Sequence, residues 1–380
     1  MSLRIALLTY ATKPRGSVIH TLELAQALAK LGHRPHVFAL DKDGRGFHRR
    51  VTFAATAIPA SPCTGGTDQL VQQRIGEFVQ FFRQHLQQQP QDYDLYHAQD
   101  CLSANALAQL RAEGYIPHFV RTVHHIEAFT SLYLRDCQEK SILQPDRCLC
   151  VSDLWQTALQ KEYGITAHRV INGVSDRFSS QSSGAEAALA QAYGLTGQPI
   201  YLTVGGIEPR KNSIALLKAF CQVRTHLPNA QLVIAGGATL FDYRDYRQEF
   251  MALAQSLPEG TLVLPGVVPD ADLPALYRLA DAFIFPSVQE GWGLVVLEAI
   301  ASGRPVVTSN QPPFTEFLSD ETALLVEPNV SAIATALQQV LDPATAQRLV
   351  TNGPPLIQRY RWRTSAEMHL TLYHQLVKPP

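Results

Sequence analysis

The sequence lacks a long apolar run, an excess of charge and a cysteine pattern of any common metal-binding or redox class. No uninterrupted apolar stretch approaches the ~20 residues that a helix needs to span a bilayer, so we expect no transmembrane helix. The formal net charge of the 380 residues is -1, so no overall basic field points to nucleic acid. Residues 4–8 enter a strand-like pattern without a basic segment followed by an apolar stretch, so no signal peptide is expected.

The cysteines have neither zinc-knuckle nor thioredoxin spacing. They are Cys63, Cys101, Cys137, Cys148, Cys150 and Cys221. Cys148 and Cys150 are two residues apart in an apolar run and would face the same side of a strand. Reduced, half-buried thiols are typical of the cytoplasm, which is the location we expect.

Charge is distributed slightly unevenly along the chain. Up to Gly173 there are 18 Lys+Arg against 15 Asp+Glu, and after it there are 14 against 18. A weakly basic front half is compatible with an anionic acceptor or with peripheral contact to a membrane surface.

Short apolar runs alternate with amphipathic stretches along nearly the whole chain. A first series of runs is 4–10, 35–40, 93–99, 118–124, 147–152 and 169–174, and a second is 199–205, 231–236, 261–268, 282–287, 305–309 and 323–327. Helical patterns between them include 18–31, 68–88, 213–227 and 293–302. Continuous apolar strands separated by helices indicate parallel sheets covered on both faces. Two series therefore predict an α/β fold with two Rossmann-like domains.

The two predicted domains are residues 1–174 and 199–359. Residues 175–198 are rich in serine and glycine and are predicted to be a linker. The tail is amphipathic, and we expect a C-terminal helix at about 360–380 that packs back on the first domain.

The most specific motif follows the predicted strand 282–287. Its loop and first helical residue are Glu290, Gly291, Trp292, Gly293 and Leu294, and Glu298 lies within the helix. Glycines allow backbone N–H groups at a helix N-terminus to approach a ligand closely, and such a terminus attracts phosphate. A carboxylate at Glu298 can accept two hydrogen bonds from a ribose diol, and Glu290 can accept from sugar hydroxyls.

A second motif opens the second domain. The predicted strand 199–205 ends in Gly205 and Gly206, and the adjacent cations Arg210 and Lys211 precede a helix. Adjacent cations in such a loop suit a diphosphate, because they neutralise the charge that develops on a leaving group without a metal.

The spacing of Glu290 and Glu298, with Gly-x-Gly-Leu between them, resembles the E-x7-E signature of retaining glycosyltransferases of family four, also called glycosyl transferases group 1. The resemblance implies a GT-B fold, in which two Rossmann-like parallel-sheet domains face a central cleft. It implies that Glu298 holds the donor ribose, Glu290 the transferred sugar and Lys211 the diphosphate. Many members carry arginine where this chain has Gly206, a role that Arg210 would then take over.

The first domain is expected to bind the acceptor and cover the donor. Gly16 matches the second glycine of a Gly-Gly pair in the family, which implies that its backbone approaches the diphosphate, and Arg15 replaces the first. His124 ends the predicted fourth strand, at the sheet edge where ligands bind in open α/β sheets. It matches a family histidine that lies near the transferred sugar, whereas His125 replaces the family's aspartate.

We expect neither a cofactor nor a metal. D-x-D strings, which hold a metal in glycosyltransferases of the other main fold, occur at 41–43, 92–94 and 270–272, but in a loop, before a strand and at a helix start. The resemblance implies transfer of a hexose from a nucleoside diphosphate sugar, with a UDP-sugar such as UDP-glucose favoured and a GDP-sugar possible, to an unidentified sugar, lipid or small-molecule acceptor. Open alternatives are a sugar-nucleotide epimerase, a non-catalytic nucleotide-sugar-binding protein and a phosphorylase-like enzyme carrying pyridoxal phosphate on a lysine.

Overall fold

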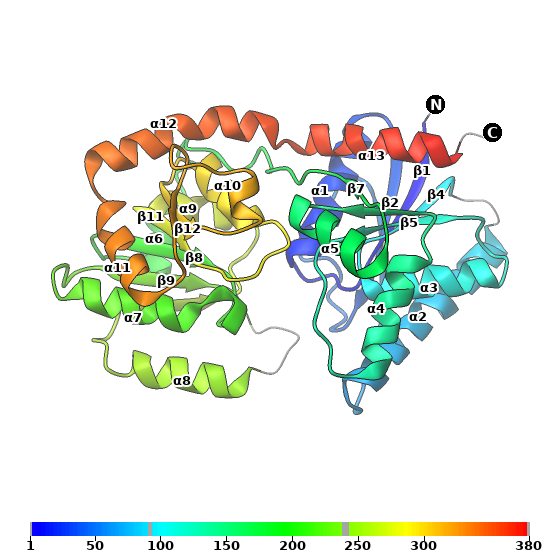
Figure 1. The fold of residues 1–380 in the computed structure, drawn as a ribbon, viewed down its shortest axis with the longest axis horizontal. Helices are drawn as coiled ribbons and strands as arrows, with labels where there is room; N and C mark the ends of the chain where they lie inside the picture. Colours follow the sequence, from blue (N-terminus) through cyan, green and yellow to red (C-terminus); the bar gives the residue numbers. More distant parts are fainter. Residues whose placement is uncertain (1, 90–92, 238–242, 378–380) are drawn as a thin grey trace. The chain divides into compact units, whose positions relative to one another are not determined.

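The computed structural model describes residues 2–89, 93–237 and 243–377 of the chain. It forms two compact units (Figure 1). The first combines Met1–Gly173 with Arg361–Pro380, and the second is Val174–Tyr360. Each unit is a parallel sheet with helices on both faces, so the predicted α/β class with two Rossmann-like domains is confirmed. No helix in the described ranges is both long and apolar enough to cross a membrane.

The sheet of the first unit has the order β3-β2-β1-β4-β5-β6-β7. Its strands are β1 (Arg4–Thr9), β2 (Arg34–Asp41), β3 (Ala54–Pro59), β4 (Leu95–Ala98), β5 (Phe119–Val123), β6 (Arg147–Cys150) and β7 (His168–Arg169). β1 pairs with both β2 and β4, so the strand order reverses between β1 and β4. Ligands of open α/β sheets bind beyond the carboxyl ends of the strands at such a reversal.

Helices cover the two faces of this sheet. They are α1 (Gly16–Lys30), α2 (Thr67–Gln88), α3 (Cys101–Ala112), α4 (Leu132–Leu143), α5 (Asp153–Tyr163) and α13 (Trp362–Val377). α13 lies beside α1 on one face, although the two are far apart in the sequence, and α2 and α3 cover the other (Figure 1). The buried face of α13 presents Trp362, His369 and Tyr373 at helical spacing, so this helix contributes polar groups to the core of the first unit.

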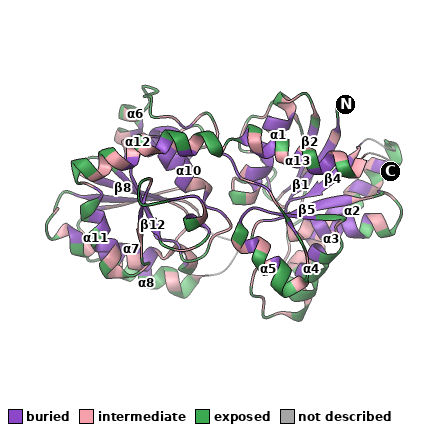
Figure 2. Cartoon of the chain, turned by 45° about the horizontal axis from the view of Figure 1, so that its top comes forward, coloured by how far each residue is buried: buried purple, intermediate pink, exposed green. Residues whose placement is uncertain are grey.

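The sheet of the second unit has the order β10-β9-β8-β11-β12-β13, with its reversal between β8 and β11. Its strands are β8 (Ile200–Val204), β9 (Gln231–Ala235), β10 (Leu262–Gly266), β11 (Ala282–Phe285), β12 (Val306–Ser309) and β13 (Leu324–Val326). Its helices include α6 (Glu186–Tyr193), α7 (Ser213–Arg224), α8 (Arg244–Ala254), α9 (Leu273–Leu279), α10 (Leu294–Ala301), α11 (Val330–Gln339) and α12 (Pro343–Arg359). α7 and α11 pack together over one apolar core, and the strands are buried between the helical layers (Figure 2).

The structure departs from the sequence expectations in three places. β3 was not predicted, because it is a short edge strand made largely of alanine with one buried residue, Ile58, so His124 follows the fifth strand rather than the fourth. The expected strand at 169–174 is reduced to β7. The predicted linker 175–198 belongs to the second unit, since its helix α6 packs on α9 and Glu186 pairs with Arg278 at 2.6 Å.

The chain crosses between the units twice at neighbouring points. The N–H of Val174 donates to the carbonyl of Tyr360 at 2.9 Å, and α12 ends where this contact forms. A Cβ atom on Gly173 would lie 2.2 Å from the backbone nitrogen of Trp362. Only glycine therefore permits this close approach, which lies at the start of α13.

Candidate active site

The two cations of the second unit are fixed by a single-turn 3-10 helix, Pro209–Lys211, that follows β8. Gly205 and Gly206 form the connection, and the N–H of Gly205 donates to the carbonyl of Ala235 at 2.8 Å. The turn ends at Asn212, whose side-chain amide donates to the carbonyl of Pro328 at 2.7 Å. Lys211 is thereby held at the carboxyl edge of the sheet, beside the strand-order reversal.

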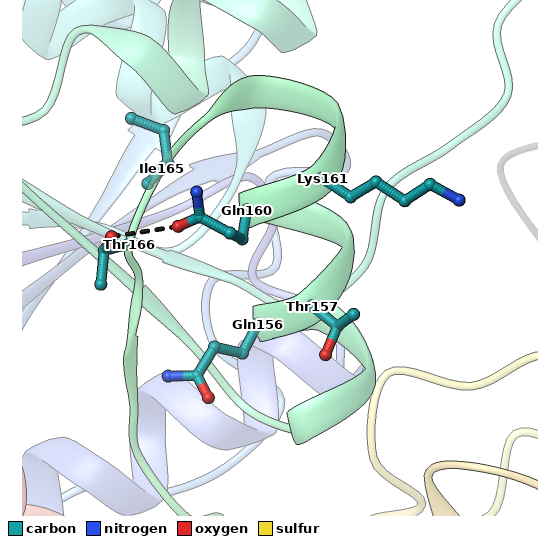
Figure 3. Close-up of a pocket in the computed structure, with 6 residues that line it drawn as sticks. All are labelled: Gln156, Thr157, Gln160, Lys161, Ile165 and Thr166. Carbon is teal, nitrogen blue, oxygen red and sulfur yellow. Dashed lines mark hydrogen bonds between the residues drawn. The ribbon is translucent and has the colours of Figure 1, made fainter.

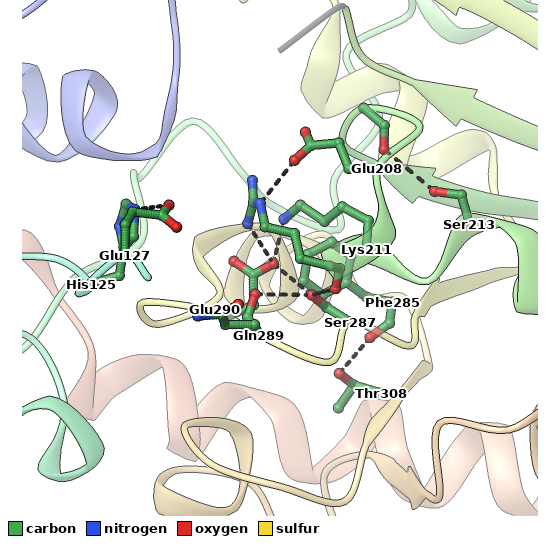
Figure 4. Close-up of polar contacts among 12 residues, drawn as sticks. His125, Glu127, Glu208, Lys211, Ser213, Phe285, Ser287, Gln289, Glu290 and Thr308 are labelled. Carbon is green, nitrogen blue, oxygen red and sulfur yellow. Dashed lines mark hydrogen bonds and ion pairs between the residues drawn. The ribbon is translucent and has the colours of Figure 1, made fainter. Parts of the chain in front are cut away.

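One carboxylate oxygen of Glu290 contacts both cations, and Figure 4 labels Glu290 and Lys211. Its Oε1 atom is 2.5 Å from Nζ of Lys211 and 3.2 Å from Nη1 of Arg210. A second carboxylate, Glu208, accepts from Nε of Arg210 at 2.8 Å. The structure thus brings together three of the four residues that the sequence proposed as catalytic, from segments 79 and 80 residues apart.

Ser287 joins the two loops of this site. Its hydroxyl contacts both the carbonyl of Arg210 and Oε1 of Glu290, each at 2.7 Å. The N–H of Val288 also donates to the carbonyl of Arg210 at 2.8 Å. Because a hydroxyl and an amide both hold the Arg210 backbone, the cation loop and the glutamate loop are fixed relative to one another.

Burial and charge determine the ionisation of this cluster. Burial opposes ionisation of Glu290, but the positive charges of Lys211 and Arg210 outweigh it and hold the pKa of Glu290 below its ordinary value. Burial lowers the pKa of Lys211, an effect that Glu290 opposes and Arg210 reinforces. The Lys211 ammonium also lies 4.4 Å from the ring centroid of Phe285. Desolvated charges of this kind interact more strongly with a ligand charge than charges in water.

The glutamate loop reaches the N-terminus of α10 through Gly293. This residue has φ +108°, and a Cβ atom there would lie 2.7 Å from the ring of Phe314. Both facts require glycine. Gly291 is half-buried, and Leu294 is the first residue of the helix. The backbone of this turn can therefore approach an anion at the helix N-terminus.

Trp292, which the sequence places in the donor-binding loop, has a buried side chain. The indole is 2% exposed and stacks on Phe317, with ring centroids 4.5 Å apart. It also lies against Tyr360 at 5.4 Å. Because the side chain is buried in these contacts, Trp292 can contact a ligand only through its backbone.

Glu298 lies on the buried side of α10. Its Oε2 atom accepts from the hydroxyl of Tyr277 at 2.8 Å. Burial, followed by the charge of Glu298, raises the pKa of Tyr277 well above its ordinary value, so the phenol stays a donor. Tyr277 and Ser287 orient the two signature glutamates, and neither was predicted, because each is a single polar residue outside the motif spacing.

In the first unit, Gly16 and His124 lie at the carboxyl ends of β1 and β5. Gly16 begins α1, and a Cβ atom there would contact nothing, so its expected role rests on the helix N-terminus. The Nε2 atom of His124 lies 3.2 Å from Oε1 of Gln99. His125 and Glu127 pair separately at 2.8 Å on the surface (Figure 4).

The described parts of the D-x-D strings are held by other contacts. Asp41 accepts from the N–H groups of Gly44 and Gly46, and Asp43 pairs with Lys13 at 2.9 Å. Asp270 pairs with Arg177 at 2.5 Å, whereas Asp92 lies outside the described residues. Across the described ranges, no group of three or more His, Cys, Asp or Glu side chains is arranged to hold a metal ion.

A depression of about 400 Å³ lies on α5 of the first unit (Figure 3). It is lined by Gln156, Thr157, Gln160, Lys161, Ile165 and Thr166. None of the residues proposed for chemistry lines it.

Comparisons with known proteins agree with this geometry. The family model "Glycosyl transferases group 1" matches residues 187–354, and "Glycosyltransferase Family 4" matches residues 14–178. The chain is 29% identical over 286 residues to O-antigen chain mannosyltransferase B of Escherichia coli, covering 69% of this chain and 72% of that protein. It is also 29% identical over 374 residues to the phosphatidyl-myo-inositol mannosyltransferase of Mycobacterium leprae, covering 95% and 93%.

Solved structures share the fold. Sucrose-phosphate synthase from Thermosynechococcus elongatus superposes with a TM-score of 0.79 at 24% identity, covering 98% of this chain and 99% of that one. Anabaena Alr3699/HepE in complex with UDP and glucose gives a TM-score of 0.77 at 18% identity, covering 99% and 100%. The family models, the relatives and the fold lead to one conclusion: the chain belongs to the group 1 glycosyltransferases and is a GT-B enzyme that uses a nucleotide sugar.

Proposed function

We propose that this enzyme transfers a hexosyl residue from a nucleoside diphosphate hexose to a hydroxyl acceptor, with retention of configuration and without a metal. The observation that carries the proposal is the half-buried cluster of Lys211, Arg210 and Glu290 beside the N-terminus of α10. Two cations and helix N–H groups suit a diphosphate, and the carboxylate suits sugar hydroxyls.

The reaction breaks the bond between the anomeric carbon and the β-phosphate oxygen. Negative charge then grows on that oxygen, and Lys211 and Arg210 stabilise it more strongly than they stabilise the intact donor. The acceptor oxygen bonds to the same face of the anomeric carbon, and its proton passes to the departing phosphate. Within the described cluster the one carboxylate in contact with both cations is Glu290, whose charge is already paired, so we assign it to sugar binding and not to nucleophilic attack.

For the donor, we infer a mannosyl nucleotide ahead of UDP-glucose, which the sequence had favoured. The support is that both relatives described above are named mannosyltransferases, and a further similar protein is a "GDP-mannose-dependent" mannosyltransferase of Mycolicibacterium smegmatis. Acceptors to be compared are free sugars and lipid-linked sugars, since the relatives are named for O-antigen chains and phosphatidylinositol.

The test is a donor panel assayed with the purified full chain. GDP-mannose, UDP-glucose and UDP-galactose are each supplied with sugar and lipid-linked acceptors, and the linkage of any product is determined by NMR. We expect an α-linked product from an α-linked donor. A β-linked product would exclude retention, and isomerisation of the donor without transfer would identify an epimerase instead.

A further inference from the structure

Three buried histidines and the half-buried His124, which the sequence motifs had indicated, meet in the first unit. They are His20 on α1, His97 on β4, His124 after β5 and His369 on α13. The ring centroids of His20 and His124 are 4.7 Å apart, those of His20 and His369 are 5.8 Å apart, and those of His97 and His369 are 5.7 Å apart. A polar cluster of this kind is stable only if each ring has a fixed hydrogen-bonding role.

Two of these rings are held as the Nδ1–H tautomer. Nδ1 of His20 lies 2.8 Å from Oδ1 of Asn172, and Nδ1 of His369 lies 2.8 Å from the carbonyl of Ser365. Both partners are oxygen acceptors, so both Nδ1 atoms donate. Burial above all lowers the pKa of His20 to about 3 and that of His369 to about 4, so both rings are neutral near pH 7.

His97 has the opposite tautomer. The hydroxyl of Tyr373 is buried, and in the described part of the chain its hydrogen-bond contact is Nδ1 of His97, at 2.6 Å. A buried hydroxyl proton needs an acceptor, so Tyr373 donates to Nδ1. Nε2–H of His97 then donates to Oγ1 of Thr122 at 2.8 Å. The C-terminal helix α13 therefore sets the tautomer of a residue on β4.

Gln99 contacts both His97 and His124. Its Nε2 lies 3.2 Å from Nε2 and 3.3 Å from Nδ1 of His97, so the amide N–H group faces the ring and not either lone pair. An N–H group over an aromatic face is favourable, whereas a carbonyl oxygen there would meet the ring electrons. The amide oxygen consequently points to His124, 3.2 Å from Nε2. Only a protonated Nε2 can donate to it.

We propose that Gln99 is a positioning residue that holds His124 as its Nε2–H tautomer and presents Nδ1 as a hydrogen-bond acceptor for a hydroxyl of the sugar substrate. Within the described ranges Nδ1 of His124 has no hydrogen-bond partner, and the residue is half-buried at the carboxyl end of β5. Burial, reinforced by His20, holds the pKa of His124 well below its ordinary value, so the ring is a neutral acceptor and not an acid.

The tautomer assignment stands on the first unit alone, while the contact between Nδ1 and a hydroxyl rests on the proposed function. The first experiment therefore uses no substrate. In full-length protein labelled with 15N-histidine, imidazole nitrogen shifts distinguish a protonated from a bare nitrogen, and the signals that disappear in His124→Asn identify residue 124. We expect a protonated Nε2 and a bare Nδ1 in the wild type. A protonated Nδ1 would overturn the proposal.

The second experiment compares Gln99→Met and Tyr373→Phe with the matched control Tyr115→Phe, which removes a half-buried hydroxyl of the same unit. Met keeps the volume of Gln99 but has no strong acceptor, so we expect the His124 signals to show both tautomers. Tyr373→Phe removes the hydrogen bond to Nδ1 of His97 and leaves the ring face to the Gln99 amide, so it should leave the His124 signals unchanged, as should Tyr115→Phe. Unchanged His124 signals in Gln99→Met, with an unchanged thermal melt, would exclude a positioning role.

Kinetics complete the test. We expect kcat/KM for sugar transfer to fall about tenfold in Gln99→Met, the effect of one weakened hydrogen bond, while nucleoside diphosphate affinity is unchanged. A mixed tautomer with full transfer activity would overturn the role assigned to Nδ1. If no donor and acceptor support transfer by the wild type, the proposed function fails, and the nitrogen shifts still decide the tautomer.

Discussion

The ammonium of Lys211 lies 2.5 Å from Oε1 of Glu290, so one carboxylate is bound to a cation that a diphosphate also needs. Arg210 approaches the same oxygen at 3.2 Å. A diphosphate that enters this site must share the two cations with Glu290 or displace Glu290 from them. A displaced Glu290 can then accept a hydrogen bond from a sugar hydroxyl. The two glutamates of the signature thus have different relationships to the nucleotide, and mutation separates them.

Glu290→Gln is expected to strengthen binding of free nucleoside diphosphate while it reduces turnover. The substitution removes a charge that competes for Lys211 and Arg210, and roughly 1 kcal/mol of such competition corresponds to about fivefold in affinity. Calorimetry with GDP and UDP measures this change, with Glu249→Gln on the surface of α8 as the control. Weaker nucleotide binding in Glu290→Gln would mean that the carboxylate holds the nucleotide itself.

Glu298 is expected to act on nucleotide affinity instead. Its Oε2 is oriented by Tyr277 at 2.8 Å, and the side chain is buried in α10. Glu298→Gln should weaken nucleoside diphosphate binding about tenfold, because a carboxylate accepts more strongly from a ribose diol than an amide does. Tyr277→Phe should weaken binding less, since it removes only the orienting hydroxyl. Equal nucleotide affinities of Glu298→Gln and the wild type would remove the ribose assignment.

The residues of this site that could be predicted from the sequence are those that belong to contiguous motifs. Glu290, Glu298 and Lys211 occur in contiguous motifs, where spacing and glycines carry the signal. Their orienting partners Ser287 and Tyr277 are single polar residues, and only the fold brings them to the glutamates.

The histidine cluster was harder still to predict. Its members come from α1, β4, the end of β5 and α13, at separations of up to 349 residues, and no spacing connects them. The layers were predictable because apolar runs mark parallel strands. β3 was not predicted, because this half-exposed edge strand consists mainly of alanine and lacks the large apolar side chains that mark a buried strand.

Lys211→Ala is expected to reduce kcat about a hundredfold, because the loss of a contact that strengthens in the transition state costs about 3 kcal/mol. Arg210→Ala should cost less, since its side chain is 38% exposed against 13% for Lys211. Lys218→Ala, on the outer side of α7, is the control. Steady-state kinetics with the true substrates, supported by thermal melts, gives the comparison. A Lys211→Ala enzyme with nearly wild-type kcat would contradict the leaving-group role.

Chelation is expected to leave activity unchanged. The Arg210–Lys211 pair supplies the positive charge that a metal would otherwise bring to the diphosphate. Transfer is measured after dialysis against EDTA and again after addition of magnesium or manganese. Activity lost in EDTA and restored by either ion would show that the cations do not suffice.

Acid is expected to destabilise the first unit because its core histidines are neutral. Their pKa values are lowered in the folded protein, to about 3 for His20 and about 4 for His369, whereas an unfolded histidine titrates near 6.5. The unfolded chain therefore binds more protons below about pH 6.5, and the free energy of unfolding falls as the pH falls through this window.

Between pH 7 and 5 each such histidine should lower the free energy of unfolding by about 2 kcal/mol. Denaturant unfolding at both pH values, followed by the fluorescence of Trp362 in a variant that lacks the other tryptophans, measures the loss for the first unit. His369→Gln removes one titrating group, so between pH 7 and 5 the free energy of unfolding of this variant should fall by about 2 kcal/mol less than that of the wild type. His226→Asn replaces an exposed histidine of the second unit, and its free energy of unfolding should fall by the same amount as that of the wild type. If His369→Gln and the wild type lose the same amount, His369 is not neutral in the core, and the tautomers assigned around it lose their basis.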